Sequence, residues 1–307
     1  MNRIKSGGQI GVIAPAWIPI SARLEHGYNY LKQKGYRVKL SQNITRKHAY
    51  FAGTEAQRLD DIHEMFSDPE IDAIFCARGG WGGLRLIDQI DFDLIAQNPK
   101  PFVGYSDITT LQLAFWKKTN LPSFSGPMVA VEMGKGIDPF TENHFWGLML
   151  NKDRFYTVNL GETATTIHTN GKASGVLLGG CLAMISTLLG TPFSPDYRGS
   201  ILFIEDVGEK PYKIDRYLAH LKQAGVFEEI NGLILGEFLD CVAEDDEESF
   251  TISELIDQYF SESTYPVIKD FPYGHGDVKI TMPIGCQTQM DTAEKSIQFL
   301  NPFFNPV

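Results

Sequence analysis

A serine at a sharp strand-to-helix junction is the first residue of this sequence that can do chemistry. Ser106 follows an apolar run at 102–105 and precedes a stretch with apolar residues at helical spacing. At such a junction the hydroxyl is held out of the sheet, and the first amides of the helix point toward any anion that forms beside it. This geometry suits a nucleophile. Two observations favour a simple helix cap instead: serine is a common N-cap residue, and Ile108 stands where the Gly-x-Ser-x-Gly elbow has its second glycine.

A nucleophilic serine needs a base, and the base needs an acid that orients it. His275 is the candidate base, because it lies between two glycines that let the backbone bend and let a substrate approach the ring. Glu205 is the candidate acid, because a carboxylate at the end of an apolar strand is rigid and partly desolvated. The alternative is that Glu205 and Asp206 charge the first turn of the next helix, where the helix dipole favours acids. The sequence contains no His-Glu-x-x-His or other metal-ligand spacing, so we expect neither a metal nor a cofactor.

A glycine cluster with the sequence Arg-Gly-Gly-Trp-Gly-Gly occupies residues 78–83, directly after an apolar run. Counted from Gly80, the dinucleotide fingerprint Gly-x-Gly-x-x-Gly has Arg85 in place of its last glycine, and the Walker lysine is absent, so a non-catalytic nucleotide-binding module is a weak alternative. The exposed amides suit the oxyanion of an acyl-transfer intermediate, although a tight turn with positive φ also needs glycine. Cys76 precedes the turn and is a competing nucleophile for an amidotransferase-like enzyme, but its apolar surroundings predict burial.

The composition bounds the class of protein and its partners. A chain of 307 residues predicts about two domains, and a formal net charge of −11 argues against nucleic acid or an anionic membrane as a partner. A small anionic substrate is compatible with this charge, since a local basic pocket overrides the net field. The four cysteines lie far apart without a Cys-x-x-Cys pair, which is typical of reduced thiols in the cytoplasm. No apolar stretch has the length of a signal peptide or a membrane span, so we expect a cytoplasmic location.

The elements that position these residues alternate between strands and helices in the first part of the chain. The predicted strands are apolar runs at 9–14, 36–40, 71–77 and 102–105. This alternation predicts a parallel sheet with helices on both faces. Since the working loops of such sheets lie at the carboxyl ends of the strands, Ser106 and the glycine cluster are expected at one edge. We expect Ser21 to cap the first helix, a capping box from Thr54 to open the second, and residues 84–90 to form a short helix.

A second, mixed α/β region is predicted to follow. Residues 140–150 are expected to form a helix, and residues 151–172 are polar and without helical period, which indicates a linker with room for short edge strands. The chain thus divides into a nucleophile domain at 1–150 and a smaller C-terminal domain at 173–307, which carries the acid and the base. The strands expected in the second domain lie at 174–178, 200–205 and 233–236, and near Val267, Ile280 and Ile297. The acidic run at 244–248 is expected to be a solvated loop.

Taken together, six motifs resemble those of the LD-carboxypeptidase family, the serine peptidases that include muramoyltetrapeptide carboxypeptidases and microcin C immunity peptidases. These motifs span most of the chain and occupy residues 78–83, 104–109, 124–128, 177–183, 204–216 and 274–276. The resemblance implies an N-terminal domain similar to class I glutamine amidotransferases, a smaller C-terminal α/β domain and a homodimer. It also implies that Ser106, Glu205 and His275 form a catalytic triad, and that the backbone amides of Gly80 and Asp107 form the oxyanion hole.

The activity implied by the resemblance is hydrolysis of an L,D peptide bond, which releases the terminal D-alanine of murein tetrapeptide in cell-wall recycling. The motif around Glu205 is closer to this branch than to the microcin branch, whose action on peptidyl or aminoacyl nucleotide analogues is the alternative. A carboxypeptidase must also hold a free carboxylate. Arg78 is our candidate anchor, because a planar guanidinium suits a carboxylate, although a salt bridge that braces the loop is another interpretation. Trp81 is expected either to line the pocket or merely to pack.

Overall fold

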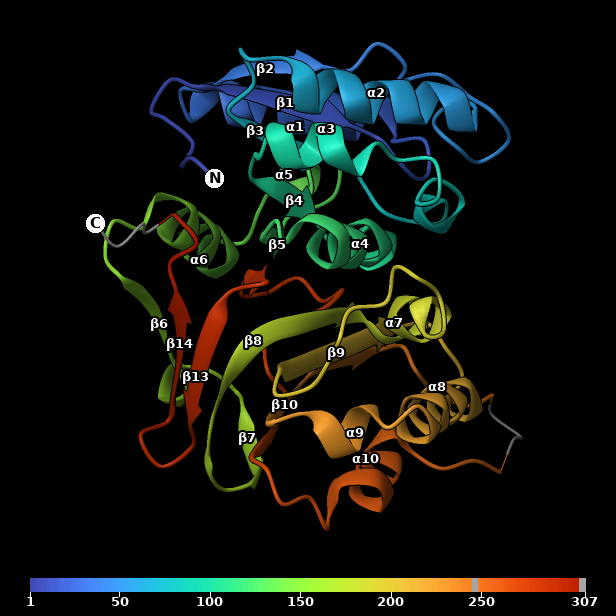
Figure 1. Ribbon diagram of the computed structural model, residues 1–307, viewed down its shortest axis with the longest axis vertical. Helices are drawn as coiled ribbons and strands as arrows, with labels where there is room; N and C mark the ends of the chain where they lie inside the picture. Colours follow the sequence, from blue (N-terminus) through green and yellow to red (C-terminus); the bar gives the residue numbers. More distant parts are fainter. Residues whose placement is uncertain (245–247, 304–307) are drawn as a thin grey trace.

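Two α/β units, each built on its own sheet, make up the molecule (Figure 1). The structure is a computed structural model that describes residues 1–244 and 248–303, so most of the acidic run predicted as a solvated loop lies outside the described residues. The first unit holds a six-stranded sheet and the second an eight-stranded sheet. Both sheets contain parallel and antiparallel pairs, so the predicted α/β class is confirmed.

The first sheet has the strand order β12-β5-β4-β3-β1-β2, and the strands from the N-terminal part of the chain are all parallel. These strands are β1 (Gln9–Ile13), β2 (Arg37–Leu40), β3 (Ala73–Cys76), β4 (Phe102–Gly104) and β5 (Ser123–Ser125). Every residue of β3 and β4 is buried, as expected where helices cover both faces of a parallel sheet. The predicted parallel arrangement is confirmed, and the loops after β3 and β4 meet at one edge of the sheet.

Of the two helix N-termini predicted in the first unit, the structure confirms one and corrects the other. They are α1 (Ser21–Gln33), α2 (Glu55–Ser67), α3 (Phe92–Gln97), α4 (Thr109–Thr119), α5 (Glu132–Lys135) and α6 (Pro139–Leu150). The capping box at Thr54 is present and opens α2. Ser21 is the first helical residue of α1 rather than its cap, because Ile20 holds the N-cap position without a side-chain hydrogen bond. The helix predicted at 84–90 is wrong: only a 3₁₀ turn at Gly83–Arg85 forms, and the apolar residues after it enter the core from turns.

The second sheet joins a parallel half to an antiparallel half through the long strand β8. Its order is β6-β14-β13-β8-β9-β10-β11-β7, in which β8 to β11 run parallel and the rest antiparallel. Both edge strands, β6 and β7, lie within residues 151–172, the segment predicted as a linker. The strands of this sheet are β6 (Phe155–Asn159), β7 (Thr166–Thr169), β8 (Lys172–Cys181), β9 (Ile201–Val207), β10 (Gly232–Leu239), β11 (Val267–Lys269), β13 (Gln287–Asp291) and β14 (Ser296–Leu300).

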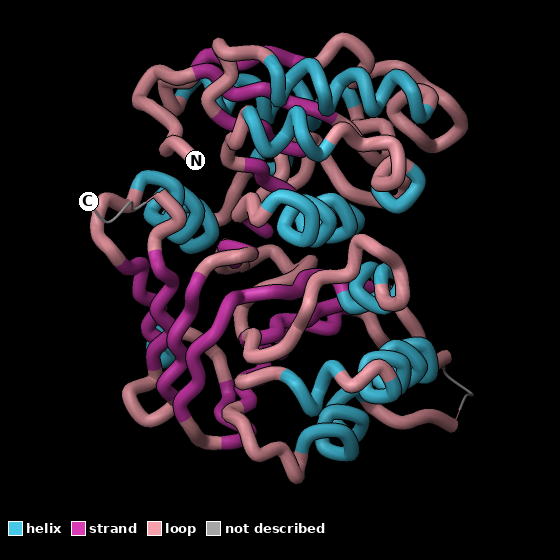
Figure 2. The backbone as a smooth tube through the Cα atoms, in the orientation of Figure 1, coloured by secondary structure: helices cyan, strands magenta, loops and turns pink. Residues whose placement is uncertain are grey.

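The helices of the second unit gather beside the parallel half of its sheet, and the antiparallel strands lie on the other side (Figure 2). These helices are α7 (Leu182–Leu188), α8 (Pro211–Gln223), α9 (Val226–Glu229) and α10 (Ile252–Phe260). The predicted amphipathic helix around 212–224 is confirmed as α8, which buries Ile214, Leu218 and Leu221.

One strand from the C-terminal part of the chain crosses to the first sheet. We expected the strand near Ile280 to complete the second domain, but β12 (Met282–Ile284) instead pairs antiparallel with β5. Pro283 is tolerated in this strand because β12 lies at the sheet edge, where a missing N–H leaves no neighbour unpaired. The segment between β11 and β12, which carries His275, is therefore attached to the second sheet at one end and to the first sheet at the other.

The two units share one apolar core. A single cluster of buried side chains extends from the first sheet through α4 and α7 into the second sheet. Helix α4 lies between the two sheets and contacts both β8 and α7 (Figure 1). The two units are thus held by buried apolar surface rather than by a bare linker. Among the helices that the structure describes, we find none with the length and apolar character that a membrane crossing requires.

Candidate active site

Ser106 sits in a strained conformation at the junction of β4 and α4. Its φ is 66°, a region that residues other than glycine rarely adopt, and such strain is concentrated at functional sites. The turn forms without the second elbow glycine, because the Ile108 side chain packs into the space that Gly104 leaves open. Ser106 does not act as a helix cap: the N-cap positions here belong to Tyr105 and Ile108. In the described part of the chain its hydroxyl makes no hydrogen bond and is half-buried.

The glycine cluster lies directly against Ser106. A Cβ atom added at Gly79 would be 2.9 Å from Ser106 Cβ and 3.1 Å from Ser106 Oγ. Gly80 is exposed, has a φ of 117° and packs beneath the ring of Trp17. The positive φ values at Gly80 and Gly82 show that the turn does require glycine, as one interpretation of the sequence held. The cluster also brings backbone groups to the side of the serine, where amides suit an oxyanion.

The side chain of Asp107 holds this loop in place. Its carboxylate accepts hydrogen bonds from the amides of Gly82, at 3.2 Å, and Gly83, at 2.8 Å. Because these amides are already bound, they are not free to cradle a phosphate, which weakens the nucleotide-binding alternative. Burial raises the pKa of Asp107 to about 6, against the opposing effect of the two amides and of the Arg58 guanidinium.

Arg58 holds the same loop from its other side. The buried guanidinium donates from Nη1 to the carbonyls of Pro15 and Gly82, at 2.6 Å and 3.2 Å. Sequence reasoning missed both this contact and the Asp107 carboxylate. Arg58 carries no signal in the sequence, because it lies on α2 and reaches the loop only in the folded chain. The resemblance to the family implies a role only for the backbone amide of Asp107.

His275 and Glu205 form a hydrogen-bonded pair at the boundary of the two units. His275 Nδ1 lies 2.7 Å from Oε2 of Glu205, a fully buried carboxylate on β9. Gly274 and Gly236 permit this approach, since a Cβ atom at either position would crowd the Glu205 side chain. Glu205 is not part of a helix start, because α8 begins only at Pro211. The alternative that it charges a first helical turn is therefore wrong.

The neighbouring acid, Asp206, faces a different environment. Its carboxylate accepts from the amide of Ala183, in the first turn of α7, and from its own neighbour Val207, both at 2.9 Å. Burial raises the pKa of Asp206 to about 6, and the charge of Glu205 adds to this effect. Of the two adjacent acids, Glu205 therefore binds the histidine and Asp206 binds the start of α7.

Tyr105 connects the histidine to the chain segment that carries the serine. The Tyr105 ring, one residue before Ser106, meets the His275 ring edge to face with the centroids 5.0 Å apart. Tyr105 thus links the segment that carries the candidate nucleophile to the paired candidate base and acid. In the described residues no hydrogen bond joins Ser106 to His275. A strained serine next to a glycine loop and an imidazole held by a buried carboxylate are the components that serine hydrolases use.

Arg78 and Trp81 belong to the glycine loop that lies against Ser106. The Arg78 guanidinium lies 5.3 Å from the centroid of the Trp17 ring, and its Nε donates to the carbonyl of Gly79. Within residues 1–244 and 248–303 Arg78 makes no ion pair, so the interpretation of a bracing salt bridge is not supported. Burial and the nearby charge of Arg23 lower the pKa of Arg78. Trp81 is half-buried.

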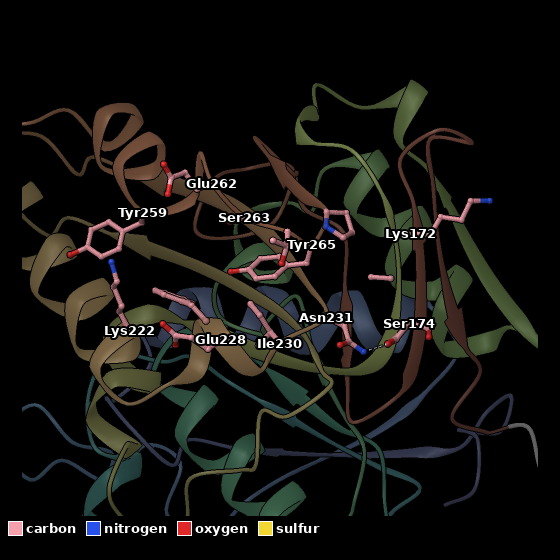
Figure 3. A pocket seen from close by; sticks show the side chains of 14 residues that line it. Lys172, Ser174, Lys222, Glu228, Ile230, Asn231, Tyr259, Glu262, Ser263 and Tyr265 are labelled. Atoms are coloured by element: carbon pink, nitrogen blue, oxygen red, sulfur yellow. Dashed lines mark hydrogen bonds between the residues drawn. The ribbon is translucent and has the colours of Figure 1, made fainter.

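Other candidate chemistry finds no support in the described residues. Cys76 is fully buried, and burial together with the charge of Asp107 raises its thiol pKa well above the usual value, which disfavours a nucleophilic thiolate. The described part of the chain contains no group of three or more His, Cys, Asp or Glu residues that could hold a metal. A cavity of about 650 Å³ lies in the second unit, away from the serine and the histidine, and Lys222, Asn231, Tyr259 and Tyr265 line it (Figure 3).

Comparison with known proteins identifies the family. The profile of the LD-carboxypeptidase N-terminal domain matches residues 10–126, and that of the LD-carboxypeptidase C-terminal domain matches residues 174–290. A probable murein peptide carboxypeptidase of Bacillus subtilis is 39% identical over 95% of this chain and 92% of its own length. The microcin C7 self-immunity protein MccF of Escherichia coli is 26% identical over 95% of this chain and 92% of its own length.

A solved structure agrees with these sequence matches. The crystal structure of muramoyltetrapeptide carboxypeptidase from Oxalobacter formigenes superposes with a TM-score of 0.84 at 30% identity, and the match covers 95% of this chain and 97% of that one. The chain therefore belongs to the LD-carboxypeptidase family, and the resemblance stated from its motifs is confirmed. As a member, it is a hydrolytic carboxypeptidase with the two-sheet α/β fold of its relatives.

Proposed function

We propose that this protein is a serine LD-carboxypeptidase that hydrolyses the L,D peptide bond of murein tetrapeptide and releases its terminal D-alanine in cell-wall recycling. The observation that carries the proposal is the His275–Glu205 pair against the ring of Tyr105, the residue before the strained Ser106, in a chain 39% identical to a probable murein peptide carboxypeptidase. Mass spectrometry of tetrapeptide incubated with the enzyme tests it. The wild type should convert tetrapeptide to tripeptide plus alanine, and the Ser106→Ala variant should not.

The chemistry assigned to these residues follows the logic of a catalytic triad. His275 removes the Ser106 proton through Nε2, the ring nitrogen that Glu205 leaves free, while Ser106 Oγ attacks the carbonyl carbon of the scissile bond. The amides of Gly80 and Asp107 stabilise the resulting oxyanion. The imidazolium then donates its proton to the leaving nitrogen, and D-alanine departs. Water, deprotonated by His275, hydrolyses the acyl-enzyme, releases the tripeptide and regenerates the serine.

The fully buried position of Glu205 supports its role as the orienting acid. Because Oε2 binds the ring at Nδ1, the neutral histidine keeps its proton on Nδ1 and presents Nε2 as the acceptor. The carboxylate also stabilises the imidazolium that forms when the serine proton is taken. Oε1 makes no hydrogen bond in the described residues, so the pairing with His275 is the contact that this side chain provides.

Two residues are proposed to contact the peptide. Arg78 is assigned to a substrate carboxylate, because its guanidinium has no acidic partner in the part of the chain that is described and lies next to the glycine loop. Trp81 is assigned to the pocket wall, since it is half-buried within that loop. A free terminal carboxylate bound at such a site would distinguish a carboxypeptidase from an endopeptidase.

We further infer a division into a nucleophile domain at 1–150, a linker at 151–172 and a C-terminal domain at 173–307, with a homodimer as the assembly and the cytoplasm as the location. The family profiles end at 126 and begin at 174, which is consistent with a boundary between them. Size-exclusion chromatography with light scattering tests the dimer, and fractionation of cells that produce the protein tests the location.

A second candidate function is hydrolysis of peptidyl or aminoacyl nucleotide analogues, favoured by the 26% identity with MccF. The chemistry would be the same and only the group beyond the scissile bond would differ. Turnover of murein tetrapeptide and of an aminoacyl sulfamoyl adenosine by one preparation separates the two functions. Preference for the adenosine compound by kcat/KM would favour the second candidate.

A further inference from the structure

A buried ion pair lies directly behind the candidate serine and histidine. The ammonium of Lys279 contacts the carboxylate of Glu132, and both side chains are almost completely removed from solvent. Tyr105 joins them, because its hydroxyl donates to Oε1 of Glu132 at 2.7 Å and lies 3.3 Å from Nζ of Lys279. The second oxygen of Glu132 accepts from the amide of Met128 at 2.9 Å. Every charged atom of the pair therefore has a partner.

This ion pair is not explained by stability alone. Moving two charges out of water costs several kcal/mol per ion, and apolar residues of similar volume are often as stable or more stable. The segments that the pair connects indicate a second role. Glu132 belongs to α5 in the first unit, whereas Lys279 belongs to the segment between β11 and β12, which also carries His275.

Tyr105 is the point where this cluster meets the candidate triad. Its ring contacts His275 edge to face at 5.0 Å, and Nζ of Lys279 lies 4.4 Å from the same ring's centroid. Ser106 is the next residue in the chain. The ion pair thus fixes the hydroxyl end of the Tyr105 side chain, whose ring contacts the histidine. The backbone of Tyr105 is held at the end of β4, directly before the serine.

The histidine segment is fastened to the first unit on both sides of His275. Before it, the hydroxyl of Tyr273 is 2.7 Å from Oγ of Ser125 on β5. After it, the amide of Lys279 donates to Oγ1 of Thr141 on α6 at 2.9 Å, and the Lys279 side chain reaches Glu132. These contacts lie two residues before the histidine and four residues after it. They therefore fix the position of the His275 ring relative to the first unit.

We propose that Lys279 and Glu132 are positioning residues for the hydrolytic reaction, and that their buried ion pair holds the His275 segment of the second unit against Ser106 of the first through Tyr105. This inference rests on the proposed function, in which His275 is the base. The pair touches neither substrate nor reacting atoms, so its removal changes the rate of chemistry and leaves peptide binding largely intact.

The central experiment uses the double variant Glu132→Gln/Lys279→Met, because Lys279→Met alone would leave a buried, unpaired carboxylate and destabilise the fold. The double variant should remain folded, with kcat for tetrapeptide at least tenfold below the wild type and KM within twofold. A folded double variant with kcat within twofold of the wild type would overturn the proposal. Tyr105→Phe, which removes only the hydroxyl, supplies a milder test and should lower kcat in the same direction.

A matched control lies between α1 and α6, where no hydrogen bond or ring contact of the described residues joins Glu142 or Lys34 to Tyr105 or His275. There Tyr30 donates to Glu142 at 2.6 Å and Lys34 pairs with the same carboxylate at 2.7 Å, which repeats the residue types away from His275. Glu142→Gln/Lys34→Met should shift the melting temperature without changing kcat. An equal loss of kcat in this control would show that general destabilisation, rather than positioning, explains the effect and would overturn the proposal.

A spectroscopic readout separates failure of the inference from failure of the proposed function. The proton on Nδ1 of His275, bound to Glu205, should give a downfield proton resonance that disappears in His275→Gln. In the double variant this resonance should move or broaden, whether or not tetrapeptide is the substrate. Absence of turnover by the folded wild type would refute the proposed function, whereas an unchanged resonance in the double variant would refute the positioning role.

Discussion

Oδ2 of Asp107 accepts a 2.8 Å hydrogen bond from the amide of Gly83, and Oδ1 accepts from the preceding amide at 3.2 Å. The residue after the candidate nucleophile thus fixes the loop proposed to bind the oxyanion. This carboxylate is buried and interacts with the thiol of Cys76 and the guanidinium of Arg58. Since its ionised form accepts the two hydrogen bonds that hold the loop, its charge determines whether the loop is held.

The first prediction concerns the acid limb of the pH profile. The ionised Asp107 carboxylate accepts from two amides, and its protonation on falling below pH about 6 replaces an acceptor with a donor and loosens the loop. The acid limb of log kcat/KM should therefore be steeper in the wild type than in Asp107→Asn, by one unit of slope. Equal slopes in the two enzymes would show that Asp107 does not titrate with activity.

The same ionisation has a consequence for stability, with a definite sign. The pKa of Asp107 is raised from 3.8 to about 6, so the folded state binds this proton more tightly than the unfolded chain does. Its contribution to stability therefore falls as pH rises from about 4 to about 6, by an amount on the order of 3 kcal/mol. Asp107→Asn removes this loss, and urea unfolding at pH 5 and pH 7.5 should show a smaller difference in the variant than in the wild type.

A second prediction uses the strain at Ser106. Both Ser106→Ala and Ser106→Gly should abolish D-alanine release. A non-glycine residue at a φ of 66° costs about 1–3 kcal/mol, whereas the freedom of glycine in the unfolded chain costs about 0.5–1 kcal/mol. The glycine variant should therefore be more stable than the alanine variant, by about 1 kcal/mol in the free energy of unfolding.

Asn120 provides the control for this comparison. It adopts a φ of 54° where α4 ends, a position at which asparagine is well tolerated. Asn120→Gly should therefore change the free energy of unfolding only slightly. This change should be smaller than the difference in unfolding free energy between Ser106→Gly and Ser106→Ala. Equal unfolding free energies for the two Ser106 variants would mean that the junction is not strained.

A third prediction concerns the buried acid. Glu205→Gln keeps the shape but removes the charge that orients His275 and stabilises its protonated form. We expect kcat to fall by about 10³- to 10⁴-fold, as in triads that lose the charge of the acid. Asp206→Asn is the matched control, since this adjacent buried acid binds the start of α7 and not the histidine. If the two variants lost activity equally, Glu205 would have no special role.

The pairing of Glu205 with His275 could be predicted from the sequence, because Glu205 ends an apolar strand and His275 stands between two glycines. What the sequence hid depends on the folded chain. The strand β12 is three residues long and contains Pro283, so no periodic pattern reveals that it joins the first sheet. The partners of Asp107, and the burial of Lys279 against Glu132, likewise arise only when distant segments pack.

The last prediction tests the substrate-carboxylate role of Arg78. Arg78→Lys keeps the charge but removes the planar fork and the stacking over Trp17. If Arg78 binds a carboxylate of the peptide, KM should rise by about tenfold or more with little change in kcat, since a hydrogen bond to a charged group contributes about 1.5–3 kcal/mol. Arg85→Lys is the control, because Arg85 already pairs with Glu55 at 2.5 Å on the surface. A peptide amidated at its C-terminus should lose more affinity for the wild type than for Arg78→Lys, if the anchored group is the terminal carboxylate. An equal loss of affinity in both enzymes would show that another residue binds the terminal carboxylate. The role of Arg78 would then be to support the glycine loop.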